Sequence, residues 1–184
     1  MDTRLALSDA KGPLGDLLEK LSSESGGTWL SALNRMLRKE NPWGAETFRF
    51  AFRGEVRKAN ELKEYGFDRW ERDIPVTPGE IEIELGEFLK PKEEWVKGTV
   101  MDERTFIAGS NLGLGHALEM YERRDEIPVE LRKFVLVFTG TVLVRGHGGR
   151  YVAYLHWLGD QWYLGFRWLG RDFISRDRVL RSRK

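Results

Sequence analysis

The stretch 133–169 contains two turn signals that fix the faces of the strands around them. Gly159-Asp160 is typical of a two-residue hairpin turn, because such turns need positive φ and so favour Gly and Asp. This turn brings aromatic and apolar residues opposite one another on one side, the apolar face: Trp157 with Trp162, Leu155 with Leu164, Ala153 with Phe166, and Tyr151 with Trp168. The other side, the mixed face, pairs Leu158 with Gln161, His156 with Tyr163, Tyr154 with Gly165, and Val152 with Arg167.

A second turn, at 146–149, joins an earlier strand to this hairpin, with Arg145 opposite Arg150. This register predicts Val144, Val142 and Phe138 on the apolar face, and Leu143, Thr141 and Thr139 on the mixed face. Since a one-residue slip exchanges the two faces of a strand, the two turns test each other. The sequence therefore predicts an antiparallel three-stranded meander over 133–169, with its Trp-rich face in the core.

The composition is that of a folded protein outside the membrane. The chain has 184 residues, 41% of them hydrophobic and seven of them Trp, which is enough for one domain with a proper core. No run of about 18 uncharged apolar residues occurs, and the N-terminus lacks the pattern of a secretory signal. With no Cys, disulfides and thiolate sites are excluded. We expect a cytoplasmic protein without a membrane partner.

The N-terminal third is expected to be helical. Residues 1–12 are predicted to form a loose arm, and 13–44 a helical hairpin. The first helix is indicated by leucines at helical spacing, and the second begins near Thr28 and ends at Asn41-Pro42. These leucines are Leu14, Leu17, Leu18 and Leu21.

Residues 45–184 are expected to form an α+β domain that ends in the meander. Period-two alternation predicts strands at 48–52 and 79–88, the second with outward Glu82 and Glu84. A short helix should close at Gly66, and 67–74 should form a further turn. Asp102 can cap a helix that runs to about Gly109. The alternation in 116–124 favours a strand, although a helix competes, and a single last strand is expected around 173–180.

This order of elements resembles a group of uncharacterised bacterial hypothetical proteins. The resemblance is carried by residues 29–43, WLSALNRMLRKENPW, with its LRKENPW motif, by LGEF in the acidic strand, and by the NLGLG link into LEMY. It implies a short helix followed by a small α+β domain over about 14–184. The Cys-Pro that often follows the Gly-Leu link in the group is absent here. The group lends no activity, so the resemblance bears on architecture alone.

Charge is distributed unevenly, although the net charge is only +1. Residues 80–126 carry −6 and residues 132–184 carry +8. Either the two segments neutralise each other within the fold, or the second forms a basic surface for an anionic partner.

Catalytic and cofactor motifs are absent from the sequence. His116, His147 and His156 have no metal-binding spacing, and no GxSxG or phosphate-loop pattern occurs. We therefore predict no metal and no cofactor. Two of these histidines, His147 and His156, could still serve as the base of a hydrolase if the fold places one in a pocket beside a carboxylate.

The mixed face of the meander is the candidate binding surface. Its rings and guanidinium could stack against single-stranded nucleic acid, with nearby basic residues attracting phosphate, or a helix could simply cover it. The candidate residues are Tyr154, His156, Tyr163, Arg167, Arg176 and Arg178. Our first hypothesis is a non-catalytic module that binds a protein partner. Nucleic-acid binding is the second hypothesis and a histidine-dependent hydrolase the third.

Overall fold

The computed structural model describes residues 11–23, 26–27, 29–30, 33, 47–54 and 60–183, and the chain divides into two units, Met1–Glu46 and Thr47–Lys184. In the first unit, α1 (Lys11–Leu21) confirms the predicted leucine helix. It begins earlier than expected, inside the predicted arm. Pro13 lies in its first turn, where the missing N–H would have no partner in any case. The predicted second helix and the LRKENPW stretch lie largely outside the described residues.

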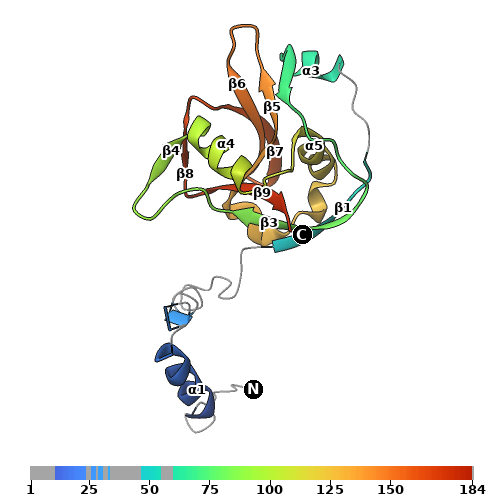
Figure 1. The fold of residues 1–184 in the computed structure, drawn as a ribbon. Helices are drawn as coiled ribbons and strands as arrows, with labels where there is room; N and C mark the ends of the chain where they lie inside the picture. The colour runs from blue at the N-terminus through green and yellow to red at the C-terminus, as the bar shows by residue number, and fades with distance from the viewer. Residues whose placement is uncertain are drawn as a thin grey trace. The chain divides into compact units, whose positions relative to one another are not determined.

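The second unit combines short helices with a large, mostly antiparallel sheet and is therefore α+β (Figure 1). Its helices are α3 (Asn60–Glu64), α4 (Gly98–Ile107) and α5 (Leu114–Glu122), with 3-10 turns at Arg124–Glu126 and Val129–Lys133. Its strands are β1 (Thr47–Phe52), β2 (Arg69–Arg72), β3 (Gly79–Gly86), β4 (Trp95–Lys97), β5 (Val135–Val144), β6 (Arg150–Leu158), β7 (Gln161–Trp168), β8 (Asp172–Ile174) and β9 (Asp177–Ser182). Among the described residues, no helix is long and apolar enough to cross a membrane.

Seven strands form the main sheet, in the order β1-β3-β9-β5-β6-β7 with β2 beside β5. All described pairings are antiparallel except that of β5 with β9. Strands β4 and β8 form a separate two-stranded sheet. The sheet has a core on each side, with α5 on one side and α4 with β4 and β8 on the other (Figure 1).

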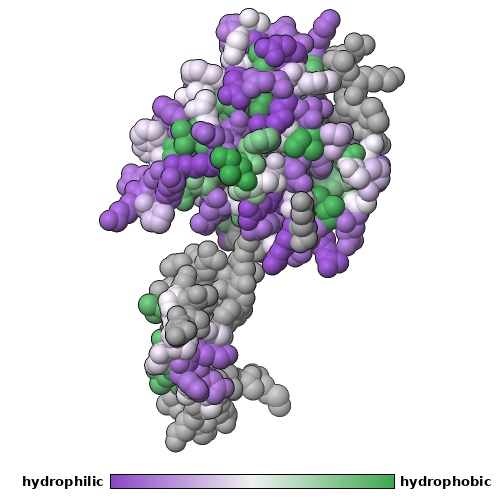
Figure 2. Space-filling model, viewed as in Figure 1, coloured by the Kyte–Doolittle hydropathy of each residue, from purple (hydrophilic) through white to green (hydrophobic). Residues whose placement is uncertain are grey.

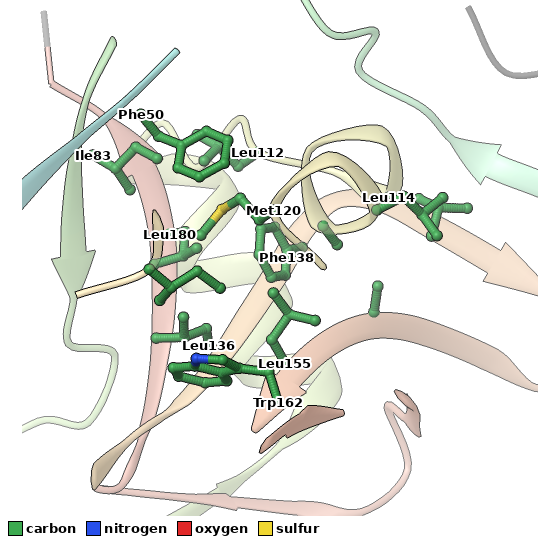
Figure 3. Packing of buried hydrophobic residues seen from close by; sticks show 14 of the residues in the cluster. Phe50, Ile83, Leu112, Leu114, Met120, Leu136, Phe138, Leu155, Trp162 and Leu180 are labelled. Atoms are coloured by element: carbon green, nitrogen blue, oxygen red, sulfur yellow. The ribbon is translucent and has the colours of Figure 1, made fainter. Parts of the chain in front are cut away.

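The larger core lies on the apolar face of the meander. Trp162 is 2% exposed and lies beside Leu136 and Leu155, while Met120 of α5 contributes from above (Figure 3). The Trp-rich face is only partly buried, because Trp168 at the end of β7 remains 49% exposed.

The predicted register of the last hairpin is confirmed at all eight pairs, from Tyr151 opposite Trp168 to Leu158 opposite Gln161. Gly159 has φ +64°, as the turn requires. Local turn chemistry and alternation were therefore sufficient to place these two strands.

The predicted register of β5 against β6 is wrong near the first turn. Val144, not Arg145, lies opposite Arg150, and Leu143 lies opposite Tyr151. Leu143 therefore packs in the core on the apolar face and Val142 in the other core, the reverse of the prediction. The cause is an irregularity between Phe138 and Leu143 that changes the register, so Phe138 keeps its predicted apolar face.

The irregularity in β5 accommodates the segment before α5. The Gly140 N–H donates to the Leu112 carbonyl at 2.9 Å, and the Thr141 hydroxyl accepts the Leu114 N–H at 2.9 Å. A Cβ on Gly140 would lie 2.7 Å from the Leu112 carbonyl carbon. Only glycine allows the two backbones to approach so closely.

Gly140→Ala is expected to lower the free energy of unfolding by about 2 kcal/mol, because the backbone of Leu112 and Gly113 must move away. Chemical denaturation measures this loss. Gly86→Ala is the matched control, since a Cβ there would lie 3.3 Å from a single carbonyl oxygen of Val179. Equal losses in the two variants would contradict the close approach at Gly140.

Four further predictions are wrong. Residues 69–72 form β2 and not a turn, because they pair with β5. The segment predicted as a strand at 116–124 lies mostly in α5. Because this helix is buried on most of its sides, its apolar residues do not recur at the 3.6-residue spacing by which an amphipathic helix is recognised. Asp102 lies inside α4 and caps nothing. The last strand is two strands, β8 and β9, separated by a turn.

Candidate binding surface

Three rings line up across β6 and β7 on the mixed face. Tyr154 and His156 have ring centroids 5.4 Å apart, and His156 stacks on Tyr163 at 5.7 Å with an interplanar angle of 27°. We call Tyr154, His156 and Tyr163 the aromatic row. The hairpin register brings these residues together as the sequence predicted.

Arg167 is fixed at one end of the aromatic row. Its Nη1 donates to Asp177 Oδ1 at 2.8 Å, and its guanidinium lies 5.1 Å from the ring centroids of both Tyr154 and Phe173. Asp177 is 1% exposed and also accepts the Ile174 N–H at 2.9 Å. The charge of Arg167 is thus already matched by a buried carboxylate.

Only part of the aromatic row is open to a ligand. Tyr154 packs against the core beneath α4, and its ring covers Gly165, where a Cβ would lie 2.5 Å from Tyr154 Cζ. At the other end, Tyr163 is 38% exposed and the neighbouring Leu158 is 60% exposed. The covered end therefore serves packing, and the open end is available for binding.

His156 occupies the middle of the aromatic row as a neutral ring near pH 7. Burial lowers the pKa of His156, and the positive charges of Arg167 and Arg176 lower it further. Its Nδ1 is buried and has no hydrogen-bond partner among the described residues. No described carboxylate bonds this imidazole, so the geometry suits stacking better than proton transfer.

The two remaining candidate residues differ in their surroundings. Arg176 is exposed. Its backbone lies near the aromatic row, because its carbonyl accepts the N–H of Val135, the residue opposite His156. Its guanidinium makes no ion pair with any described residue. Arg178 instead pairs with Glu87 at 3.2 Å and lines a separate cleft.

Part of the C-terminal basic charge is neutralised within the sheet. Arg181 pairs with Glu84 at 2.9 Å, and Arg183 with Glu82 at 3.7 Å, where β9 lies beside β3. The acidic and basic segments of the sequence thus compensate each other, as the first of our two interpretations held.

The other two histidines serve local structure. His116 is 6% exposed in α5, and its Nδ1 accepts the Gly113 N–H at 3.1 Å. His147 Nδ1 accepts the Gly149 N–H at 3.0 Å within the exposed first turn. Within the described ranges, no group of His, Asp and Glu is arranged to hold a metal ion.

Sequence reasoning missed three features. A cleft of 460 Å³ lies between the segment after β3 and the turn between β8 and β9. Asp102 is buried between Arg72 and Arg150. Apolar side chains are also exposed on α4, including Ile107 at 80%, where hydrophobic atoms stand out from a mainly hydrophilic face (Figure 2). All three depend on segments distant in sequence, and no local motif marks them.

No known protein family, no curated protein and no solved structure matches this chain. The function is therefore argued from the geometry of the described residues alone.

Proposed function

We propose that the chain is a non-catalytic binding module that takes up an extended peptide segment of a protein partner along the edge of β7. The observation that carries this proposal is the position of β7 at the end of the strand order, where its outer edge has no described partner strand. Such an edge presents unpaired N–H and C=O groups, with which a further strand can form hydrogen bonds.

The edge of β7 lacks the features that usually protect an edge strand. The strand is eight residues long, contains no proline, and pairs with β6 without a bulge. Its one charged residue is Arg167, which is engaged by Asp177. Natural proteins commonly blunt a free edge with lysine, proline or a bulge, so an unprotected edge indicates a binding function.

The side chains beside this edge suit a protein interface. Leu158, Tyr163 and Trp168 are exposed by 60%, 38% and 49%. Tyr and Trp are among the residues that supply most of the binding energy at protein interfaces. The expected partner segment is extended and apolar at alternate positions.

Panning a random peptide display library against the full chain tests the proposal. We expect the enriched peptides to alternate in hydrophobicity, and their affinity to fall about 30-fold in Tyr163→Ala because a central aromatic anchor is lost. Calorimetric titration measures the affinity. Ile107→Ala, on α4, is the matched control and should bind as the unaltered chain does. Unchanged binding by Tyr163→Ala, or no enriched peptide, would refute the docking surface.

Nucleic-acid binding is the second candidate, supported by the open Tyr163 ring and by the exposed Arg176, whose guanidinium makes no ion pair with any described residue. Internal pairing of Arg167, Arg178, Arg181 and Arg183 weakens it. Titrating single-stranded oligonucleotides in a salt series distinguishes the candidates, since phosphate contacts make log affinity fall linearly with log salt. The hydrolase hypothesis gains no support, because no histidine lines the 460 Å³ cleft.

A further inference from the structure

The cleft of 460 Å³ has the size of a small-molecule site, which commonly measures about 300–1,000 Å³. It lies between the segment 87–93, which follows β3, and the turn between β8 and β9. Its walls combine charged, hydroxyl and apolar side chains: Glu87, Phe88, Leu89, Lys90, Pro91, Glu93, Ser175, Asp177 and Arg178.

The carboxylates of the cleft are all occupied by protein donors. The Arg104 guanidinium donates two hydrogen bonds, of 2.5 and 2.9 Å, to the Glu93 carboxylate, and the Lys90 backbone N–H donates a third of 2.8 Å. These bonds lower the pKa of Glu93 to about 2, so it stays ionised and paired. Asp177 is held by Arg167, and Glu87 by Arg178. None of the three is left to bind a cation.

Two donors of the cleft make no hydrogen bond or ion pair with the residues that the structure describes. The Lys90 ammonium makes no ion pair with any described residue, although its charge helps to lower the pKa of Glu93. The Ser175 hydroxyl is likewise unbonded among the described residues, while its carbonyl accepts a bond from Arg178. Lys90 and Ser175 both line the cleft, one in each of the two segments that form it. An anionic group between them would gain charge-assisted hydrogen bonds.

The wall that carries Lys90 is held in place. Arg104 Nη1 also donates to the Phe88 carbonyl at 3.0 Å, and the Glu93 N–H donates to the Lys90 carbonyl at 3.0 Å. Lys92, within this turn, has φ +74°. Such anchoring lowers the ordering cost of binding. Phe88, Leu89 and Pro91 supply apolar surface next to the Lys90 and Ser175 donors.

We propose that this cleft binds a small organic anion, a carboxylate or phosphate monoester joined to an apolar body. Lys90 and Ser175 bind the anionic head, and Phe88, Leu89 and Pro91 contact the apolar body. The site is separate from the β7 edge, and its existence does not depend on the docking function proposed above.

Titrating the full chain with phenyl phosphate and with phenylacetate tests this site by calorimetry and by NMR amide shifts. We expect one of the two to bind and to shift the amides of Lys90 and Ser175, and the tighter ligand identifies the preferred head group. Inorganic phosphate should bind more weakly for lack of an apolar body, and benzyl alcohol for lack of charge. Lys90→Met should weaken binding about tenfold or more, as expected for one lost charged hydrogen bond.

Lys63→Met, on α3 and away from the cleft, is the matched control and should leave the affinity unchanged. Three results would each overturn the proposal. The first is that neither aromatic anion binds at concentrations up to about 10 mM, since a weaker affinity would not make a useful site. The second is that benzyl alcohol or inorganic phosphate binds as tightly as the aromatic anions. The third is that the Lys90→Met variant binds with full affinity. Loss of peptide binding at β7 has no bearing on these readouts, so the two proposals fail separately.

Discussion

Asp102→Asn is expected to lower the free energy of unfolding by about 3–5 kcal/mol, the largest effect among the substitutions considered, because it leaves the partly buried Arg72 without its counter-charge. Asp102 is 5% exposed in α4. Arg72 of β2 donates to its Oδ1, and Arg150 of β6 approaches its Oδ2 at 3.5 Å. This carboxylate thus links α4 to strands β2 and β6, on the side of the sheet that α4 covers.

Among the described residues, Arg72 pairs with no other carboxylate once the charge of Asp102 is removed, whereas Arg150 keeps a second partner. Arg72 also donates to the Thr139 carbonyl at 2.6 Å, and Arg150 also pairs with Glu71 at 2.9 Å. The Nε atoms of both arginines are buried and have no described partner. Asparagine keeps the size of the side chain but supplies only a neutral acceptor, so Arg72 loses its counter-ion.

Chemical denaturation of the Asp102→Asn variant measures this loss. Asp172→Asn is the control: its ion pair with Lys97, at 2.7 Å, joins side chains that are 47% and 53% exposed, and it should cost less than about 1 kcal/mol. Replacing Arg72 by methionine in the Asp102→Asn background should recover part of the stability. A loss no larger than that of the control would show that Asp102 is not a structural ion-pair centre.

Lowering the pH from 7 to 4.5 is expected to destabilise the fold through His116. Burial lowers the pKa of His116 from 6.5 to about 4, while the charge of Glu119 opposes the shift. Between these values the unfolded chain binds a proton that the folded chain does not. The contribution of His116 is therefore fully present above pH 6.5 and is lost as the pH falls towards 4, by about 3 kcal/mol in total.

The pH window separates His116 from the carboxylates. Glu93 and Glu126 have lowered pKa values because arginines bond them, so their contributions are lost only below about pH 4.5. The pKa of His156 is also lowered and adds loss of the same sign. The remaining pH dependence should therefore differ between variants that lack one histidine or the other.

Unfolding free energies of the original chain and His116→Gln, measured from pH 7 to 4.5, check the prediction. Glutamine can still accept the Gly113 N–H but cannot titrate in this range. We expect a much flatter pH dependence in His116→Gln, whatever its stability at pH 7. His156→Gln is the control and should remove only the smaller part of the slope. Equal slopes in the original chain and His116→Gln would contradict a buried neutral His116.

The candidate surface shows how far local reasoning reaches. The aromatic row follows from one turn and strict alternation, which also place Tyr154 opposite the Gly165 that its ring covers. The partial burial of the row was not predictable, because the covering residues come from α4 and β8, distant elements with no pattern of their own. The neutralisation of Arg181 and Arg183 likewise depends on β9 lying beside β3.

Local sequence patterns were sufficient to predict the elements whose period is set by neighbouring residues: α1, β1, β3 and the β6–β7 hairpin. Strand alternation and turn chemistry act over a few residues, so they can be recognised without the rest of the chain. Four features could be established from the three-dimensional fold alone: α5, β2, the irregularity in β5 and the parallel pairing of β5 with β9. In these, contacts between distant segments outweigh weak local preferences. The β7 edge and the 460 Å³ cleft also depend on the tertiary structure. The edge exists because the sheet ends at β7, and the cleft forms where two segments distant in the sequence meet.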